Sequence, residues 1–158
     1  MKSPLFLLWF LFHQAPISPL SPKAFQSIPS FQVSILYTIQ PEGYTLDYIV
    51  TPDSLRVHYR CLFTRCRDSV LYGIPLDGQN ASGYYQFVRQ LRLDPLQNLN
   101  ETKGSDRVTV LVQIRCSGQP PQTLLTVHLD QPVIASLITR TNNLIPNPAY
   151  RFSVPNSP

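Results

Sequence analysis

Apolar and polar residues alternate along much of the chain, as they do in strands that bury one face. Turn-forming residues, for example Pro41 and Gly43, separate the alternating stretches, and no stretch predicts a convincing helix. The pattern predicts an all-β protein, a single antiparallel β-sandwich of about seven to eight strands. The expected strands are residues 31–39, 44–50, 55–63, 69–74, 84–93, 107–116, 122–130 and 133–139. In the fifth, Tyr85 and Phe87 share the inward face, so we expect Tyr84 to be exposed.

The amino terminus has the layout of a secretory signal peptide. Met1 and Lys2 form a positively charged start, and residues 4–12 form an apolar run that is too short to span a membrane. The alternative is a buried terminal helix or strand. We expect a signal peptide in residues 1–24, cleaved somewhere in 15–24, and therefore a secreted, extracellular protein. No second long apolar run follows, so we expect no transmembrane span in the mature chain.

Proline-rich flanks set the expected domain boundaries. Residues 25–30 form an extended lead-in, residues 31–140 form the sandwich domain, and residues 141–158 form an extended Pro/Asn-rich tail.

The chain has three cysteines, Cys61, Cys66 and Cys116. Cys61 and Cys116 both fall on apolar strand faces, which meet across a sandwich core, so we expect a Cys61–Cys116 disulfide. That bridge would stabilise by about 4 kcal/mol, against about 2 kcal/mol for the alternative Cys61–Cys66. The longer bridge leaves Cys66 free, and a disulfide-linked dimer through Cys66 is then possible.

Two inward cysteines 55 residues apart in an all-β chain resemble the immunoglobulin-type sandwich. Fibronectin-type modules and the sandwich domains of egg-coat proteins are similar in pattern. The resemblance covers roughly residues 31–140. Tyr72 stands where the immunoglobulin family usually has a core Trp, and Ile114 replaces its Tyr two residues before the second cysteine.

Two motifs, Asn80-Ala-Ser82 and Asn100-Glu-Thr102, are acceptors for N-glycosylation in an exported chain. Both fall in expected loops, where a glycan is easily accommodated. Unmodified asparagines are the alternative.

The chain is sparsely charged, at 14%, but carries a net charge of +4. Five basic residues gather in or after the third expected strand: Arg56, His58, Arg60, Arg65 and Arg67. Such a cluster can attract sulfated glycans or acidic lipid headgroups, although a solvated strand face is the simpler explanation. No nucleic-acid motif accompanies the charge, so we expect no nucleic-acid partner.

The sequence carries no nucleophile elbow, no phosphate-binding glycine loop and no paired metal-ligand spacing. We therefore expect no enzyme activity, no cofactor and no metal. The sequence predicts a secreted glycoprotein that binds an extracellular or cell-surface protein. The alternative is a module that binds polyanions such as sulfated glycans or acidic lipids, and a secreted enzyme is less favoured.

Overall fold

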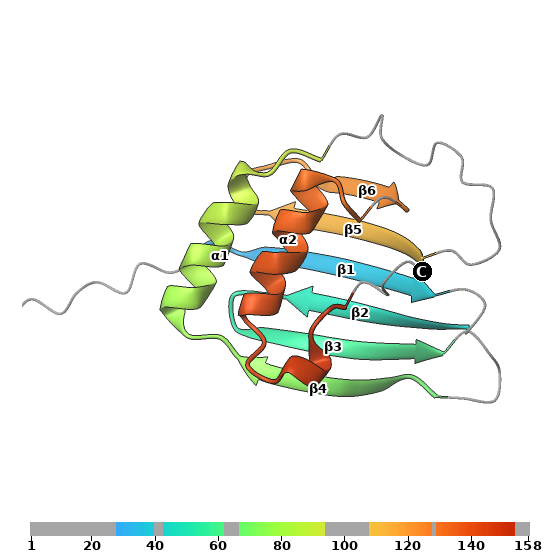
Figure 1. Ribbon diagram of the computed structural model, residues 1–158. Coiled ribbons are helices and arrows are strands. Elements are labelled where there is room, and N and C mark those ends of the chain that lie inside the picture. The colour runs from blue at the N-terminus through green and yellow to red at the C-terminus, as the bar shows by residue number, and fades with distance from the viewer. Residues whose placement is uncertain (1–27, 40–42, 62–66, 94–107, 128, 154–158) are drawn as a thin grey trace, which may run out of the picture.

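A computed structural model of the protein describes residues 28–39, 43–61, 67–93, 108–127 and 129–153. These residues form a six-stranded antiparallel sheet with two helices on one of its faces (Figure 1). The elements are β1 Phe31–Ile39, β2 Tyr44–Val50, β3 Ser54–Cys61, β4 Ser69–Pro75, α1 Gly78–Gln90, β5 Val108–Cys116, β6 Gln122–Thr126, α2 Pro132–Asn143 and a short 3₁₀ turn, η2 Pro148–Tyr150. No helix in the described ranges is long and apolar enough to span a membrane.

Strand β1 lies inside the sheet, whose order is β4-β3-β2-β1-β5-β6. The first four strands form a meander. The chain then passes through α1 before β5 pairs with the free side of β1, with Phe31 opposite Cys116. The fold is therefore mostly β, as the alternating pattern predicts, and six of the eight expected strands are confirmed.

The fifth expected strand is wrong, because residues 84–93 lie mainly in helix α1. The buried residues of α1 are Ala81, Tyr84, Tyr85 and Val88, a spacing of three and four that matches one face of a helix. Tyr84, expected to be exposed, is fully buried and packs on Phe31 with ring centroids 6.0 Å apart. The Asp77 carboxylate begins the helix by accepting a hydrogen bond from the Asn80 backbone N–H at 2.7 Å.

The eighth expected strand is also wrong, because residues 133–139 belong to α2. Pro132 opens this helix at a position where its missing N–H costs nothing. Ile134, Leu137, Ile138 and Thr141 form its buried face. Together the two helices cover the apolar side of the sheet, so the core needs no second sheet.

The prediction of a β-sandwich with an immunoglobulin-like pattern is therefore not supported: the described residues form one sheet with helices, not two sheets. Tyr72, the counterpart of the immunoglobulin core Trp in the resemblance, lies in edge strand β4. There it stacks on Tyr150 with ring centroids 4.6 Å apart. Ile114 is buried, and it packs in the core between the sheet and the helices, not between two sheets.

The predicted Cys61–Cys116 disulfide is wrong, because Cys116 is a free, buried thiol. Cys61 lies opposite Tyr44 and Cys116 lies opposite Phe31, near opposite ends of the sheet. Strands β2 and β1 also separate them, a sideways gap of about 14 Å. Cys61 is nevertheless disulfide-bonded. The alternative Cys61–Cys66 pairing involves a residue outside the described ranges and stays a prediction. The possible dimer through Cys66 was inferred from a Cys61–Cys116 disulfide, so that argument for it no longer holds.

The core continues past the predicted domain boundary at residue 140, which falls inside α2. Ile145 is fully buried, and Phe152 packs edge-on against Tyr37 with centroids 4.5 Å apart. Asn142 fixes this segment by accepting a hydrogen bond from the Phe152 backbone N–H at 2.7 Å and donating one to its carbonyl at 2.9 Å. The expected signal peptide, residues 1–24, lies outside the described ranges.

Candidate functional site

The sheet face opposite the helices is not covered by any described element, and we call it the open face (Figure 1). Its residues alternate with the core residues of the same strands. Leu36 in β1, Leu111 in β5 and Leu125 in β6 lie side by side in register and are partly exposed. Threonine, serine and glutamine side chains surround them. An antiparallel sheet with one solvated face normally has this mixed composition, so the leucine row alone does not mark a site.

Three of the predicted basic residues, Arg56, His58 and Arg60, lie on the open face of β3, as the alternation predicts. Arg60 does not provide a free charge, because its Nη2 lies 2.8 Å from Oδ2 of Asp47 on β2. Asp47 is 3% exposed, and its other oxygen accepts a hydrogen bond from Ser34 Oγ at 2.6 Å. This ion pair gives the simplest role for Arg60: its guanidinium satisfies a buried carboxylate.

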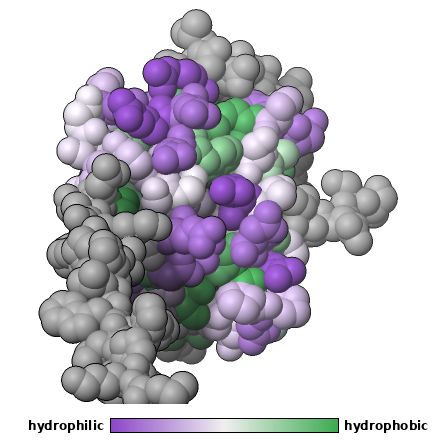
Figure 2. Space-filling model, turned by 90° about the vertical axis from the view of Figure 1, so that its left-hand side faces the viewer, coloured by the Kyte–Doolittle hydropathy of each residue, from purple (hydrophilic) through white to green (hydrophobic). Residues whose placement is uncertain are grey.

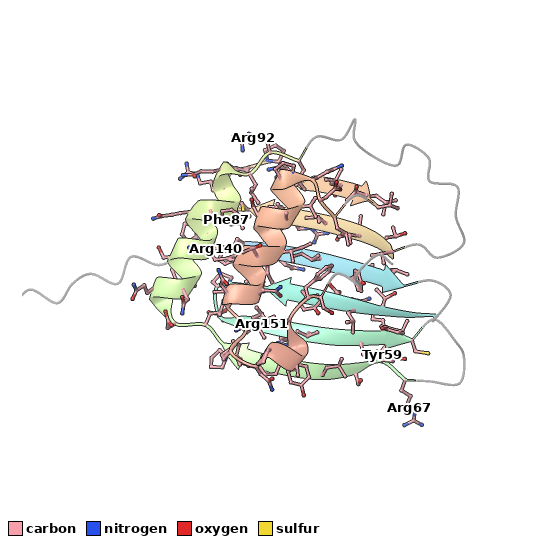
Figure 3. All side chains as sticks on the ribbon, in the orientation of Figure 1. Tyr59, Arg67, Phe87, Arg92, Arg140 and Arg151 are labelled. Atoms are coloured by element: carbon pink, nitrogen blue, oxygen red, sulfur yellow. The ribbon has the colours of Figure 1, made fainter. Side chains whose placement is uncertain are left out.

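The remaining basic residues do not extend this cluster into one surface. His58 faces Asp47 in register, and its Nε2 is buried without a hydrogen-bond partner. Arg67 is exposed and projects away from the sheet just before β4 (Figure 3). Arg65 lies outside the described ranges. Within them, only Arg56 of the β3 residues offers an exposed and unpaired cation.

Edge strand β4 is the most exposed strand of the sheet. Val70 is 58% exposed and Leu71 is 41% exposed, and no other large hydrophobic residue in the described ranges is exposed. A register shift between Val57 and His58 leaves Leu71 without a partner residue on β3. Such a bulge redirects side chains, which accounts for two neighbouring apolar residues both being exposed.

Of the two predicted glycosylation sites, Asn100 lies outside the described ranges and Asn80 lies in the first turn of α1 rather than in a loop. Asn80 is exposed, and its Nδ2 donates a hydrogen bond to Asp77 Oδ2 at 2.7 Å. The backbone hydrogen bond from Asn80 is the main cause of the lowered pKa of Asp77, so the cap stays ionised in mildly acidic solution.

A hollow of about 840 Å³ lies where β1 begins and β5 ends. Its lining includes Asp53, Arg115 and the free Cys116. Burial raises the pKa of the Cys116 thiol, which keeps it protonated and therefore weakly nucleophilic near neutral pH. Cys116 is thus not an activated nucleophile, and no group of metal-binding side chains occurs in the described part of the chain. The same side of the molecule is mainly hydrophilic, with hydrophobic residues showing only in separate patches (Figure 2).

A groove of about 690 Å³ runs between α1 and α2 on the outside of the helix layer. Phe87 of α1 and Arg140 of α2 both line it (Figure 3). The other polar lining residues are Gln86, Gln90, Ser136, Thr139 and Asn143. The alternating pattern does not predict this groove, because it assigns both segments to strands. The signal that could have found it was the spacing of apolar residues in the two segments, which gives each a helical polar face.

The chain matches no known protein-family model, no curated protein and no solved structure.

Proposed function

We propose that this protein is an exported glycoprotein that works by binding another protein through edge strand β4. The exposure of Val70 and Leu71 carries the proposal. Single exposed apolar residues are ordinary, but these two are neighbours on a sheet edge. Natural edge strands discourage pairing with charged side chains, with proline or with bulges; Ser69–Pro75 has no charged residue, and its proline stands at its end.

The partner we infer is an extracellular or cell-surface protein that contributes an extended segment. Its backbone would pair with the outer edge of β4, and its apolar side chains would cover Val70 and Leu71. Strand addition of this kind combines backbone hydrogen bonds, which give affinity, with side-chain contacts, which give specificity. The bulge at Leu71 limits regular pairing to a few residues, which favours a short partner segment.

The test compares two edge-strand variants in binding to intact cells of the source organism. Val70→Lys together with Leu71→Lys places charge on β4, and Thr123→Lys places a charge at an exposed position of β6, the opposite edge. We expect saturable binding that the β4 variant loses and the β6 variant keeps, with both variants folded by circular dichroism. Equal binding by the two would overturn the β4 site. A dimer seen by sedimentation and abolished only by the β4 changes would replace the cell-surface partner with a second copy.

Export is tested separately. Residues 4–12 support it, since such a run after a charged start directs secretion. The protein should appear in the medium with its amino terminus inside residues 16–25, and the glycan mass should fall stepwise in Asn80→Gln and Asn100→Gln. Recovery from the cytosol with Met1 attached would refute export.

We do not propose that β3 forms the polyanion-binding site of the alternative function. Of the predicted set, Arg60 is neutralised by Asp47, and Arg56 remains as a single exposed cation on that strand. Replacing Arg56 with Ser keeps the Arg60–Asp47 ion pair and should leave retention on heparin unchanged, and a marked loss of retention would restore the β3 site.

A further inference from the structure

We propose that the groove between α1 and α2 binds an anionic saccharide, with Arg140 holding its carboxylate or sulfate group. This site goes beyond the protein-binding function, because it lies on the helix layer and shares no residue with β4. The groove has a volume of about 690 Å³ and is wide open to solvent, so a ligand there would lie on the helix layer with one side exposed.

The electrostatics of the groove favour an anion. The only charged residues in the two helices are Arg89 and Arg140, and no acidic side chain lines the groove. Arg140 is exposed and has no ion pair within the described residues. A basic residue in the last turn of a helix also interacts favourably with the helix dipole, and this accounts for the positions of both Arg89 and Arg140. The dipole does not explain why Arg140 faces a groove lined by amides and hydroxyls.

Gly83 provides the second observation. It lies inside α1, where glycine costs roughly 1 kcal/mol relative to alanine. A Cβ added there would lie 3.4 Å from Nη2 of Arg140, so the guanidinium rests over the bare backbone of the facing helix. The Arg140 side chain therefore reaches across the groove to the backbone of α1 at Gly83.

The remaining lining residues suit a sugar. Amides such as Gln86, Gln90 and Asn143 both donate and accept hydrogen bonds, as hydroxyl-rich ligands require. The half-buried ring of Phe87 offers an apolar surface against which the C–H face of a sugar ring can pack. A planar guanidinium can bind carboxylate or sulfate oxygens through two parallel hydrogen bonds. Uronate and sulfated saccharides present this combination of groups.

The experiment is calorimetry on the full mature protein with three hexasaccharides. A hyaluronan fragment carries carboxylate only, a heparin fragment adds sulfate, and maltohexaose is neutral. We expect binding of at least one anionic fragment and none of maltohexaose. Tighter binding of hyaluronan would identify a carboxylate site, and tighter binding of heparin would identify a sulfate site.

The variants separate this groove from general charge attraction. Arg140→Gln should weaken binding about tenfold or more, as expected for loss of a charged hydrogen-bonding partner. Arg89→Gln removes the same charge from the last turn of the other helix and should leave affinity within about twofold. Ser136→Trp should also block binding by filling the groove without changing charge. Equal losses in Arg140→Gln and Arg89→Gln, or binding of neither anionic fragment, would overturn the site. The β4 variants should bind these fragments normally, so the two proposals fail independently.

Discussion

The hydrogen bond between Tyr84 and Thr141 joins the two helices and gives a sharp test of their packing. Tyr84 OH lies 2.8 Å from Thr141 Oγ1, and both side chains are almost completely buried. Thr141 Oγ1 in turn donates to the Leu137 carbonyl at 2.8 Å. Because threonine has only one hydroxyl proton, Tyr84 must donate in the first bond. Burial also raises the pKa of Tyr84, so this donor keeps its proton.

The donor direction predicts unequal costs for the two single substitutions. Tyr84→Phe removes the donor and leaves Thr141 still bonded to Leu137, which should destabilise the fold by about 1 kcal/mol. Thr141→Val preserves side-chain shape but leaves the Tyr84 hydroxyl buried without an acceptor, which should cost about 2 kcal/mol. The double variant removes both polar groups and should be no less stable than Thr141→Val alone.

Urea unfolding followed by far-UV circular dichroism measures these differences. In a chain of this length, each kcal/mol lowers the Tm by roughly 3 °C. Thr139→Val is the matched control, since it makes the same chemical change at an exposed position of α2 and should be nearly neutral. The reasoning fails if Thr141→Val is tolerated as well as Thr139→Val, or if the two single effects simply add in the double variant.

Asp47→Asn should cost about 2 kcal/mol because it weakens a charged hydrogen-bond pair with Arg60, while Asp53→Asn at an exposed position should be neutral in the same unfolding assay. The Cys116 thiol should react slowly with a thiol reagent in the native protein and fast in urea, and equal rates would contradict its burial. Burial raises the pKa of Tyr48 to about 12, so stability should hold below the ordinary tyrosine pKa of about 10 and fall as the pH rises toward 12, an effect that Tyr48→Phe should reduce.

The sheet was predictable because the relevant signal is local. In Phe31–Ile39, the residues Phe31, Val33, Ile35 and Tyr37 are buried and those between them are not, and a period of two is sufficient to assign a strand and its inward face. The order of the strands is a different matter. Pairing of β1 with β5 joins segments far apart in sequence, and no local pattern specifies it.

The helices were missed because their composition is poor in helix-forming residues. Helix α1 contains two glycines, an asparagine and a serine, so its helix propensity is low and did not indicate a helix. The period did carry the information, since buried residues of α2 recur at Ile134, Leu137, Ile138 and Thr141. The two missed helices then led to the sandwich, because an all-β chain needs a second sheet to cover the first.

The site predictions also succeeded where the signal is local and failed where it depends on contacts between distant segments. The alternation correctly placed Arg56, His58 and Arg60 on one face of a strand. It could not show that Asp47, on the neighbouring strand, would neutralise Arg60. The groove containing Arg140 depends on the contact of two helices, so it could not be predicted while both were assigned to strands.

The central place of β1 affects how the chain can fold during synthesis. Residues from β1 to β4 can pair with one another as soon as they leave the ribosome, because each strand follows its neighbour directly. The other edge of β1 stays unpaired until Val108–Cys116 has been synthesised. Until then this apolar strand can pair with an incorrect segment. A nascent chain stalled before residue 108 should therefore depend on chaperones in a way that the finished protein does not.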